Sequence, residues 1–435
     1  MLNFKRKVLP LLVGLLPVLA ASADKTVANF GELNTAASQV LAGETIILKN
    51  GAWNNAAIRL SGKGTKEKPI LVKAETAGQV ILTGNSTVDF TGEWITLEGV
   101  KLEGVKASRT LIVFADGAKG CRLSNSAIIN SNTGDNNWIH VRLGTFHRID
   151  HCRFSGMNQP GMGIQFETSP TVPGDHLVDN CLFMDRARGS GNGFETVRIG
   201  YSHQQNNLAR VTFDRNLFLR CNGENEIVSN KSTGNFILNN TFMDNTGEMT
   251  CRHGDKARIE GNFFLRQDRG IRLIGSDHVV VNNYIADMKS DGIILYKGES
   301  NPAPTGYEAA TNPLLAFNTI VKRPAGIVIG SGKAVAPKNV KIANNVFLLP
   351  SGNAIRYDQK PSSIAYEGNI WKGQGAGVSD AGAGMVQKDP QLEKGADGVY
   401  RPASGSPLKD AAAGLWADRR GLGTRQAAVK ARFTR

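Results

Sequence analysis

The fold is decided by residues 235–287, which read NFILNNTFMDNTGEMTCRHGDKARIEGNFFLRQDRGIRLIGSDHVVVNNYIAD. Three segments of this stretch share one pattern, and they are NFILNNTFMD (235–244), ARIEGNFFLR (257–266) and HVVVNNYIAD (278–287). In each, a short apolar strand leads to a pair of residues that ends in Asn, and larger apolar residues follow. The residues between the segments are rich in Gly, Asn, Ser and Thr, which favour turns. The stretch therefore predicts consecutive strands joined by turns.

The same pattern recurs along most of the chain, in WITLEGVKLEG (94–104), HRIDHCRFSG (147–156), HLVDNCLFMD (176–185), VTFDRNLFLR (211–220), PLLAFNTIVK (313–322), NVKIANNVFL (339–348) and SIAYEGNIWK (363–372). One Asn of each later segment recurs at intervals of 24, 22, 21, 35, 27 and 24, and these side chains are Asn216, Asn240, Asn262, Asn283, Asn318, Asn345 and Asn369. A period of about 22 residues with longer excursions is typical of the coils of a parallel β-helix. We expect the Asn side chains to stack at one corner as a hydrogen-bonded ladder.

The start of the chain predicts a cap for this helix of strands. Residues 33–41 carry apolar side chains at helical spacing, and a turn at Gly43 leads into the strand TIIL (45–48). An exposed end of a stacked-strand core needs such a cover. We therefore expect an all-β chain with a short N-terminal capping helix, a single domain over residues 24–435, and a basic tail in the last ~20 residues.

Residues 1–23 resemble a secretory signal peptide. A basic KRK (5–7) precedes the apolar stretch VLPLLVGLLPVLA (8–20) and the small residues ASA (21–23). The apolar stretch is too short, and its two prolines too disruptive, for a membrane span. We expect a secreted or periplasmic protein without a membrane span.

The formal net charge of +13 predicts an acidic partner. Removal of residues 1–23 would take away three basic residues and no acidic one, which leaves +10. Nucleic acid, an anionic membrane and an acidic polysaccharide all match this charge. An exported protein rarely meets nucleic acid, so we expect a polyanionic glycan and no nucleic-acid partner. The oligomeric state is not predicted.

The cysteines favour a packing role. They recur at intervals of 31, 29, 40 and 30 along the chain, and they are Cys121, Cys152, Cys181, Cys221 and Cys251. This spacing predicts small apolar side chains inside successive coils, with one disulfide between neighbouring coils as the alternative. Thiolate metal binding requires closer pairs than these.

The residues whose side chains are best suited to cation binding or catalysis lie between 222 and 255. Glu224 and Glu226 are two residues apart, so on a strand both carboxylates point to one face and could share a hard cation. Lys231 follows five residues later, and Arg252 with His253 arrives one repeat further on. The spacing predicts half of a calcium site with three basic groups beside it.

A second family of strands alternates with the first and carries further polar side chains. Aligned by repeat, Glu195, Glu226 and Glu248 stack at the strand starts. Four side chains of the same strand family could line a groove for a polyanion, or be ordinary surface residues, and they are Arg198, Arg272, Tyr296 and Lys297. A register shift of one residue exchanges the two faces of a strand, so the pattern alone does not decide which side chains point outward.

The whole pattern, with Asn192 in NGFETVRIG ahead of the two glutamates, resembles polysaccharide lyase family 6, which contains alginate lyases and chondroitinase B. The resemblance covers most of the mature chain, including GTKEKPILVKAE near its start and DPQLEKGADGVYRPASGSPLKDAA near its end. It implies a right-handed parallel β-helix and a Ca²⁺ cofactor. By the same resemblance, Asn192, Glu224 and Glu226 match calcium ligands. Lys231 matches the general base, Arg252 the general acid and His253 a substrate contact.

The chemistry of the residues agrees with this resemblance. β-Elimination from a uronate removes the weakly acidic C5 proton, and negative charge develops on the adjacent carboxylate, which a calcium ion can neutralise. Lys231 must be neutral to accept the proton, so its pKa must lie below the usual value near 10.4; Ca²⁺ and Arg252 would lower it. A guanidinium hardly gives up a proton, so Arg252 could instead orient a water or stabilise the departing oxygen.

We therefore predict a calcium-dependent lyase of uronate polysaccharides with alginate as the substrate. The alternatives are a dermatan sulfate lyase and a noncatalytic glycan-binding β-helix. A polygalacturonate hydrolase would need paired acids, yet the sequence has no DD pair and no NTD or GHG motif. The preference for mannuronate or guluronate stays open.

Overall fold

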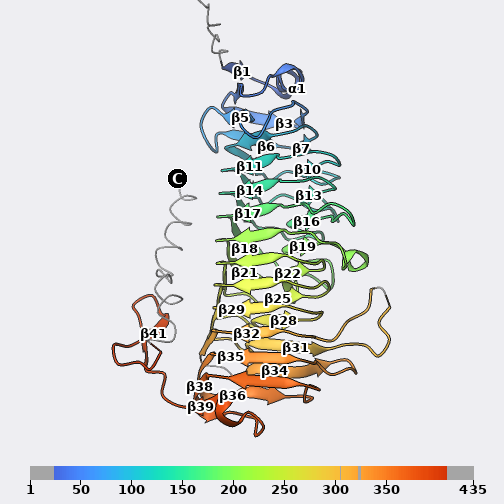
Figure 1. Ribbon diagram of the computed structural model, residues 1–435. Helices are drawn as coiled ribbons and strands as arrows, with labels where there is room; N and C mark the ends of the chain where they lie inside the picture. Colours follow the sequence, from blue (N-terminus) through green and yellow to red (C-terminus); the bar gives the residue numbers. More distant parts are fainter. Residues whose placement is uncertain (1–23, 304, 322–324, 409–435) are drawn as a thin grey trace, which may run out of the picture.

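The computed structural model describes residues 24–303, 305–321 and 325–408. Its coils are stacked along one axis into an elongated parallel β-helix, from the N-terminal cap to the orange C-terminal coils (Figure 1). The predicted signal peptide and basic tail lie outside the described residues. Within the described part, no helix has the length and apolar character that a membrane span requires.

Each coil contributes strands to three faces. The first face is a 14-stranded sheet of β1 (Lys25–Val27), β2 (Thr45–Leu48), β5 (Ile70–Ala74), β8 (Ile95–Glu98), β11 (Arg122–Ser124), β14 (Arg148–Asp150), β17 (Leu177–Asp179), β20 (Thr212–Asp214), β23 (Phe236–Leu238), β26 (Arg258–Glu260), β29 (Val279–Val281), β32 (Leu314–Ala316), β35 (Val340–Ala343) and β37 (Ile364–Glu367). All neighbouring strands in it run parallel.

The second face consists of β3 (Gly51–Asn54), β6 (Val80–Thr83), β9 (Val100–Glu103), β12 (Ala127–Ile129), β15 (Arg153–Ser155), β18 (Leu182–Arg186), β21 (Leu217–Cys221), β24 (Thr241–Met243), β27 (Phe263–Leu265), β30 (Tyr284–Ala286), β33 (Thr319–Val321), β36 (Val346–Tyr357), β38 (Asn369–Gly375) and β39 (Met385–Gln387).

The third face carries the candidate site. It consists of β4 (Ala57–Leu60), β7 (Thr87–Phe90), β10 (Ile112–Phe114), β13 (Ile139–Val141), β16 (Ile164–Phe166), β19 (Val197–Ile199), β22 (Glu226–Asn230), β25 (Glu248–Cys251), β28 (Ile271–Leu273), β31 (Ile293–Lys297) and β34 (Ala325–Gly332). The long strand β36 pairs with β33 and with β34, and so it joins the second and third faces into one sheet.

Stacked aromatic rings fill part of the core. Phe154, Phe183, Phe218, Phe242 and Phe264 come from consecutive coils, and their ring centroids are 4.6–4.9 Å apart. This distance equals the spacing of neighbouring strands, about 4.8 Å, so identical side chains stack face to face from coil to coil. The repeated position of Phe in the sequence thus becomes one continuous apolar column.

The predicted Asn ladder is present. From Asn240 to Asn369 each buried side-chain oxygen accepts a hydrogen bond from the backbone N–H of the Asn one coil earlier, at 2.8–3.0 Å. Each side-chain amide also donates to a backbone carbonyl of an earlier coil, as Asn240 does to Phe213. The ladder satisfies turn groups that would otherwise be buried without partners.

The predicted cap is the helix α1 (Phe30–Gln39). Asn29 is its N-cap, and its side chain accepts a hydrogen bond from the backbone N–H of Glu32. The helix buries Leu33, Ala36 and Ala37 against the first coils. The capping helix is therefore confirmed.

All five cysteines are buried and free of disulfides. The packing role is confirmed, and the alternative of a disulfide between coils is wrong. Burial raises the pKa of Cys121, Cys221 and Cys251 to about 12, which keeps these thiols protonated.

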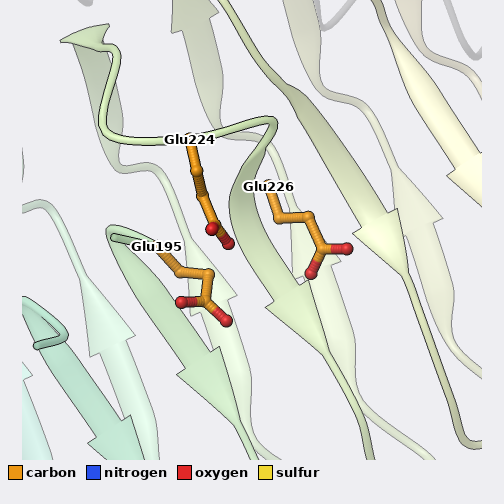
Figure 2. A group of neighbouring side chains, drawn as sticks. All are labelled: Glu195, Glu224 and Glu226. Carbon is orange, nitrogen blue, oxygen red and sulfur yellow. The ribbon is translucent and has the colours of Figure 1, made fainter. Parts of the chain in front are cut away.

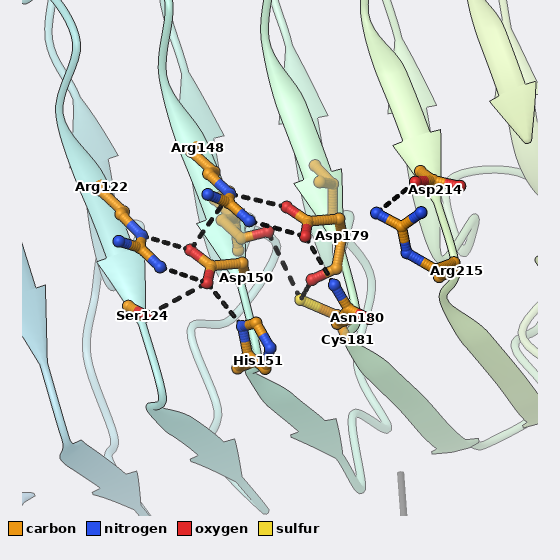
Figure 3. A network of polar contacts seen from close by, with 12 residues as sticks. Arg122, Ser124, Arg148, Asp150, His151, Asp179, Asn180, Cys181, Asp214 and Arg215 are labelled. Atoms are coloured by element: carbon orange, nitrogen blue, oxygen red, sulfur yellow. Dashed lines mark hydrogen bonds and ion pairs between the residues drawn. The ribbon is translucent and has the colours of Figure 1, made fainter. Parts of the chain in front are cut away.

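An ionic ladder ties coils together on the first face (Figure 3). Arg122 donates to Asp150 at 2.6 Å, and Arg148 donates to Asp179 at 2.8 Å. Both aspartates are almost completely buried, so the bonds compensate for their desolvation. This network lies on a different face from the candidate site and has a structural role.

After β39 the chain leaves the coils and forms a hairpin of β40 (Leu392–Lys394) and β41 (Tyr400–Pro402). The backbone N–H of Tyr400 donates to the hydroxyl of Tyr284 on the second face, at 3.0 Å. Two short 3₁₀ turns, η1 (Ser202–Gln204) and η2 (Gly382–Gly384), complete the described elements.

Candidate active site

Three glutamates meet at the start of two neighbouring strands of the third face (Figure 2). Glu195 precedes β19, Glu224 lies in the turn before β22, and Glu226 begins β22. One carboxylate oxygen of each lies within 4.8 Å of the others. A bulge between Glu226 and Val228 locally shifts the pairing with β25. We call these three residues the acidic cluster.

The electrostatics of the acidic cluster indicate a site built for a cation. Burial and the neighbouring Glu195 and Glu226 raise the pKa of Glu224 to about 7. One oxygen of Glu224 and one of Glu195 are buried and have no hydrogen-bond partner in the part of the chain that the structure describes. Burial alone would raise the pKa of Glu226, but Arg252 and Arg272 outweigh it and the net pKa is lowered. A bound cation would satisfy the unpaired oxygens and relieve the repulsion.

The donor set consists of carboxylate oxygens, which are the ligands that calcium prefers. The predicted ligands Glu224 and Glu226 are brought together. Asn192 lies three residues before Glu195 with an exposed side chain, whereas the Glu195 side chain is buried in the cluster. Glu195 was predicted to stack with Glu226, but its place in the acidic cluster was missed. Its position at the start of the aligned strands was the available signal.

Lys231 lies directly beside the acidic cluster. Its ammonium group is 3.4 Å from a carboxylate oxygen of Glu195, and the residue is 7% exposed. Burial lowers the pKa of Lys231, with Arg198 and Arg252 acting in the same direction against Glu195 and Glu226. The lowered pKa favours the neutral amine that a general base requires.

Arg252 and Arg272 form an ion-pair chain behind the cluster. Arg252 donates to Glu226 at 2.8 Å, and Arg272 donates to the same oxygen at 2.7 Å. Arg272 also lies 2.9 Å from Glu248, which is fully buried. Arg272 was predicted to bind substrate, and the structure places it between two buried carboxylates with only 17% of its side chain exposed.

Arg252 keeps one donor unused. Its Nε is buried and has no hydrogen-bond partner among the described residues. Burial by itself would lower the pKa of Arg252, but the adjacent Glu226 outweighs burial and the net pKa is raised. The group is thus a cation that keeps its charge and has one N–H without a partner among the described residues.

His253 follows Arg252 in the turn after β25 and is 2% exposed. Burial and the neighbouring Arg252 and Lys231 lower its pKa to about 4, so the imidazole is neutral near pH 7. Its ring stacks on Tyr307 at 5.5 Å. Tyr307 was not predicted from the sequence.

The remaining predicted substrate contacts lie around this centre. The Arg198 guanidinium donates to Gln165 at 2.5 Å and lies 4.9 Å from the ring of Tyr201. The ring of Tyr296 lies 5.4 Å from the Arg272 guanidinium, and Lys297 follows it at the end of β31. Arg198 and Arg272 fall in one column of the sheet through Ser229 and Thr250. Arg252 comes after β25 and so lies outside that column.

Comparison with known proteins gives the family. The model of the family described as Chondroitinase B matches residues 27–411 of this chain. The chain belongs to this family, which is polysaccharide lyase family 6, and it is a polysaccharide lyase. No curated protein matches the chain.

Solved structures of the same family are similar to the chain. A mannuronic acid specific family 6 lyase from human gut microbiota is 30% identical, with a TM-score of 0.74 over 81% of this chain and 86% of the other. The alginate lyase AlyGC is 28% identical, with a TM-score of 0.79 over 88% of this chain. This chain spans 56% of AlyGC. A family 6 polysaccharide lyase from Pseudopedobacter saltans is 27% identical, with a TM-score of 0.69 over 82% of this chain and 94% of the other.

Proposed function

We propose that the protein cleaves a uronate polysaccharide by calcium-dependent β-elimination. The observation that carries this proposal is the position of Lys231, a buried amine with a lowered pKa, 3.4 Å from a buried cluster of three carboxylates. A glycan-binding protein without catalysis would need cations for a polyanion. It would not need a buried amine with a lowered pKa beside an acidic cluster.

Glu195, Glu224 and Glu226 would hold the calcium ion, with Asn192 as the further ligand that the family resemblance implies. When bound, the ion supplies positive charge for the carboxylate of the uronate, where negative charge develops as the C5 proton leaves. Glu224, whose pKa of about 7 leaves it partly protonated at neutral pH, would lose that proton on becoming a ligand.

Lys231 accepts the proton from C5 of the uronate. The electron pair of that C–H bond forms the C4=C5 double bond, and the bond between C4 and the glycosidic oxygen breaks. The buried position of Lys231 keeps water from competing for the proton and lowers the pKa of its amine.

Arg252 stabilises the departing oxygen with the positive charge of its partly exposed guanidinium rather than by giving up its own proton. Its raised pKa supports this role, because a guanidinium beside Glu226 is an even weaker acid than usual. The leaving oxygen receives its proton from water or from the protonated Lys231. His253 is neutral near pH 7, and the family resemblance implies that it contacts the substrate.

Alginate is the substrate that we propose. Two similar structures are of a mannuronic acid specific lyase and of an alginate lyase, at 30% and 28% identity. Every residue of alginate carries a carboxylate, which suits the cations Arg198, Arg252, Arg272 and Lys297 around the site. Dermatan sulfate is the second candidate, because the matching family model is described as Chondroitinase B.

A panel of polymers tests the substrate. Purified protein is incubated with alginate, polymannuronate, polyguluronate and dermatan sulfate at equal mass, and ultraviolet absorbance of the unsaturated uronate product is followed. We expect the fastest release from one of the first three. Cleavage of dermatan sulfate alone would overturn the substrate and leave the mechanism standing.

The segment 1–23 remains our proposal for a signal peptide, and with it a secreted or periplasmic location. N-terminal sequencing of the exported protein should show a mature chain that begins near Asp24. We also propose that residues 24–435 are a single domain.

A further inference from the structure

Tyr307 belongs to a segment that reaches back across the coils toward the candidate site. Strand β31 ends at Lys297, and residues 305–311 return to the turns that follow β25 and β28. Backbone hydrogen bonds fix this path: Glu299 donates to Tyr307 at 2.8 Å, and Thr311 donates to Gly275 at 3.1 Å. Ala310 is fully buried and donates to Tyr296 at 3.0 Å. These bonds fix the backbone of Tyr307 beside the turns that follow β25 and β28.

The Tyr307 ring contacts groups of the site on several sides. The Arg252 guanidinium lies 5.4 Å from its centroid, and the His253 ring is stacked on it at 5.5 Å. The Lys333 ammonium lies 5.1 Å from the same centroid. Two consecutive residues of the site, Arg252 and His253, thus depend on one segment for their orientation.

Resting on the proposed function, we infer that Tyr307 is a positioning residue, whose ring holds the Arg252 guanidinium and the His253 imidazole toward the substrate. Arg252 has only one other charged partner within hydrogen-bond distance among the described residues, Glu226, which binds its Nη1. A single contact at Nη1 leaves the guanidinium free to rotate about that bond. The aromatic face of Tyr307 removes this freedom, because a cation is attracted to the ring wherever it lies close above it.

Two substitutions distinguish the contribution of the Tyr307 ring from that of its hydroxyl. Tyr307→Phe keeps the ring and should retain at least half of kcat. Tyr307→Ala removes the ring and should lower kcat on the order of 10-fold, the size expected for a cation–π contact that is partly desolvated. KM should change by less than about 3-fold, because the acidic cluster is untouched. Thr305→Ala, an exposed change in the same segment, is the matched control and should behave as the wild type.

A double-mutant cycle tests whether Tyr307 acts through Arg252. In an Arg252→Lys background, Tyr307→Ala should cost less than about 3-fold, since the planar group that the ring holds is gone. An undiminished loss in that background would overturn the inference. So would a Tyr307→Ala enzyme with full kcat, or a Tyr307→Phe enzyme as impaired as Tyr307→Ala.

A spectroscopic measurement keeps this test separate from the proposed function. The Arg252 Nε–H signal in a ¹⁵N–¹H spectrum is identified by its loss in Arg252→Ala. We expect it to shift in Tyr307→Ala and to keep its position in Tyr307→Phe and Thr305→Ala. If the wild type cleaves no uronate polymer, the proposed function fails, and this spectrum alone decides on Tyr307. An unchanged signal in Tyr307→Ala would overturn the inference.

Discussion

Among the single residues of the site, Lys231 is the proposed general base. Lys231→Ala removes the base and leaves the acidic cluster in place, so kcat should fall by roughly 10²- to 10⁴-fold. The measurement is the initial rate on alginate, with circular dichroism to show that the variant is folded. Lys388→Ala, the same change at an exposed lysine after β39, is the matched control. A folded Lys231→Ala enzyme with more than a tenth of the wild-type rate would remove Lys231 from the mechanism.

The buried imidazole of His147 should make the free energy of unfolding depend on pH. It is buried and stacked on His176 at 5.1 Å, and burial lowers its pKa from 6.5 to about 4. The unfolded chain therefore binds a proton between about pH 6.5 and 4 that the folded chain does not. The contribution of His147 to the free energy of unfolding is fully present above pH 6.5. It is lost as the pH falls through that window, by about 3 kcal/mol at most.

The variant His147→Asn tests this dependence. Asn235 occupies the equivalent position of a later coil and accepts the backbone N–H of Val211, as His147 accepts that of Cys121. The variant keeps the acceptor and removes the titration. Chemical denaturation at pH 7 and pH 4.5 should show a smaller loss for the variant than for the wild type. Equal losses in the two proteins would contradict the role given to His147.

The Asn ladder stabilises the stack at the scale of the element. Asn262 accepts from both the backbone and the side chain of Asn240, and donates to Ile237 and Asn283. Asn262→Ala leaves these buried groups unpaired, so the free energy of unfolding should fall by about 2–4 kcal/mol. Denaturant titration measures it, with the exposed Asn85→Ala as control. A loss below about 0.5 kcal/mol, less than one ordinary hydrogen bond contributes, would show that the ladder adds little stability.

The periodic part of the fold could be predicted from the sequence because each coil repeats the same pattern of residues. A corner Asn, a core Phe and a turn recur from coil to coil, and stacking then follows from the strand spacing. The terminal hairpin of β40 and β41 was not foreseen, because its residues share no repeat with the coils. It is held by non-repeating contacts such as that of Tyr400 with Tyr284.

The site was predicted less completely, since it depends on departures from the repeat. The bulge after Glu226 shifts the local register. Arg252 comes two residues after Thr250, the residue that pairs with Arg272, so it lies outside the column of cations that regular spacing predicted. Tyr307 comes from the longest interval in the Asn series, between Asn283 and Asn318. That interval predicted an insertion, but spacing alone does not tell where an insertion folds back.

At the scale of the whole molecule, the site lies on the third face, midway along the stack of coils (Figure 1). Its cations come from β19, β28 and β31 and from the turn after β25, so a polymer lying across these coils would meet one positive group after another. The formal charge of the chain, +13, has the same sign. Binding of the polymer should therefore weaken as salt is added, because screening acts over about 8–10 Å.

The central claim is that cleavage is an elimination that depends on calcium. The most direct measurement follows alginate digestion by ultraviolet absorbance and by reducing ends together, in chelated enzyme and after calcium is restored. We expect one unsaturated uronate for each new reducing end with calcium, and a rate near zero without it. New reducing ends without ultraviolet absorbance, or full activity in chelated enzyme, would contradict it.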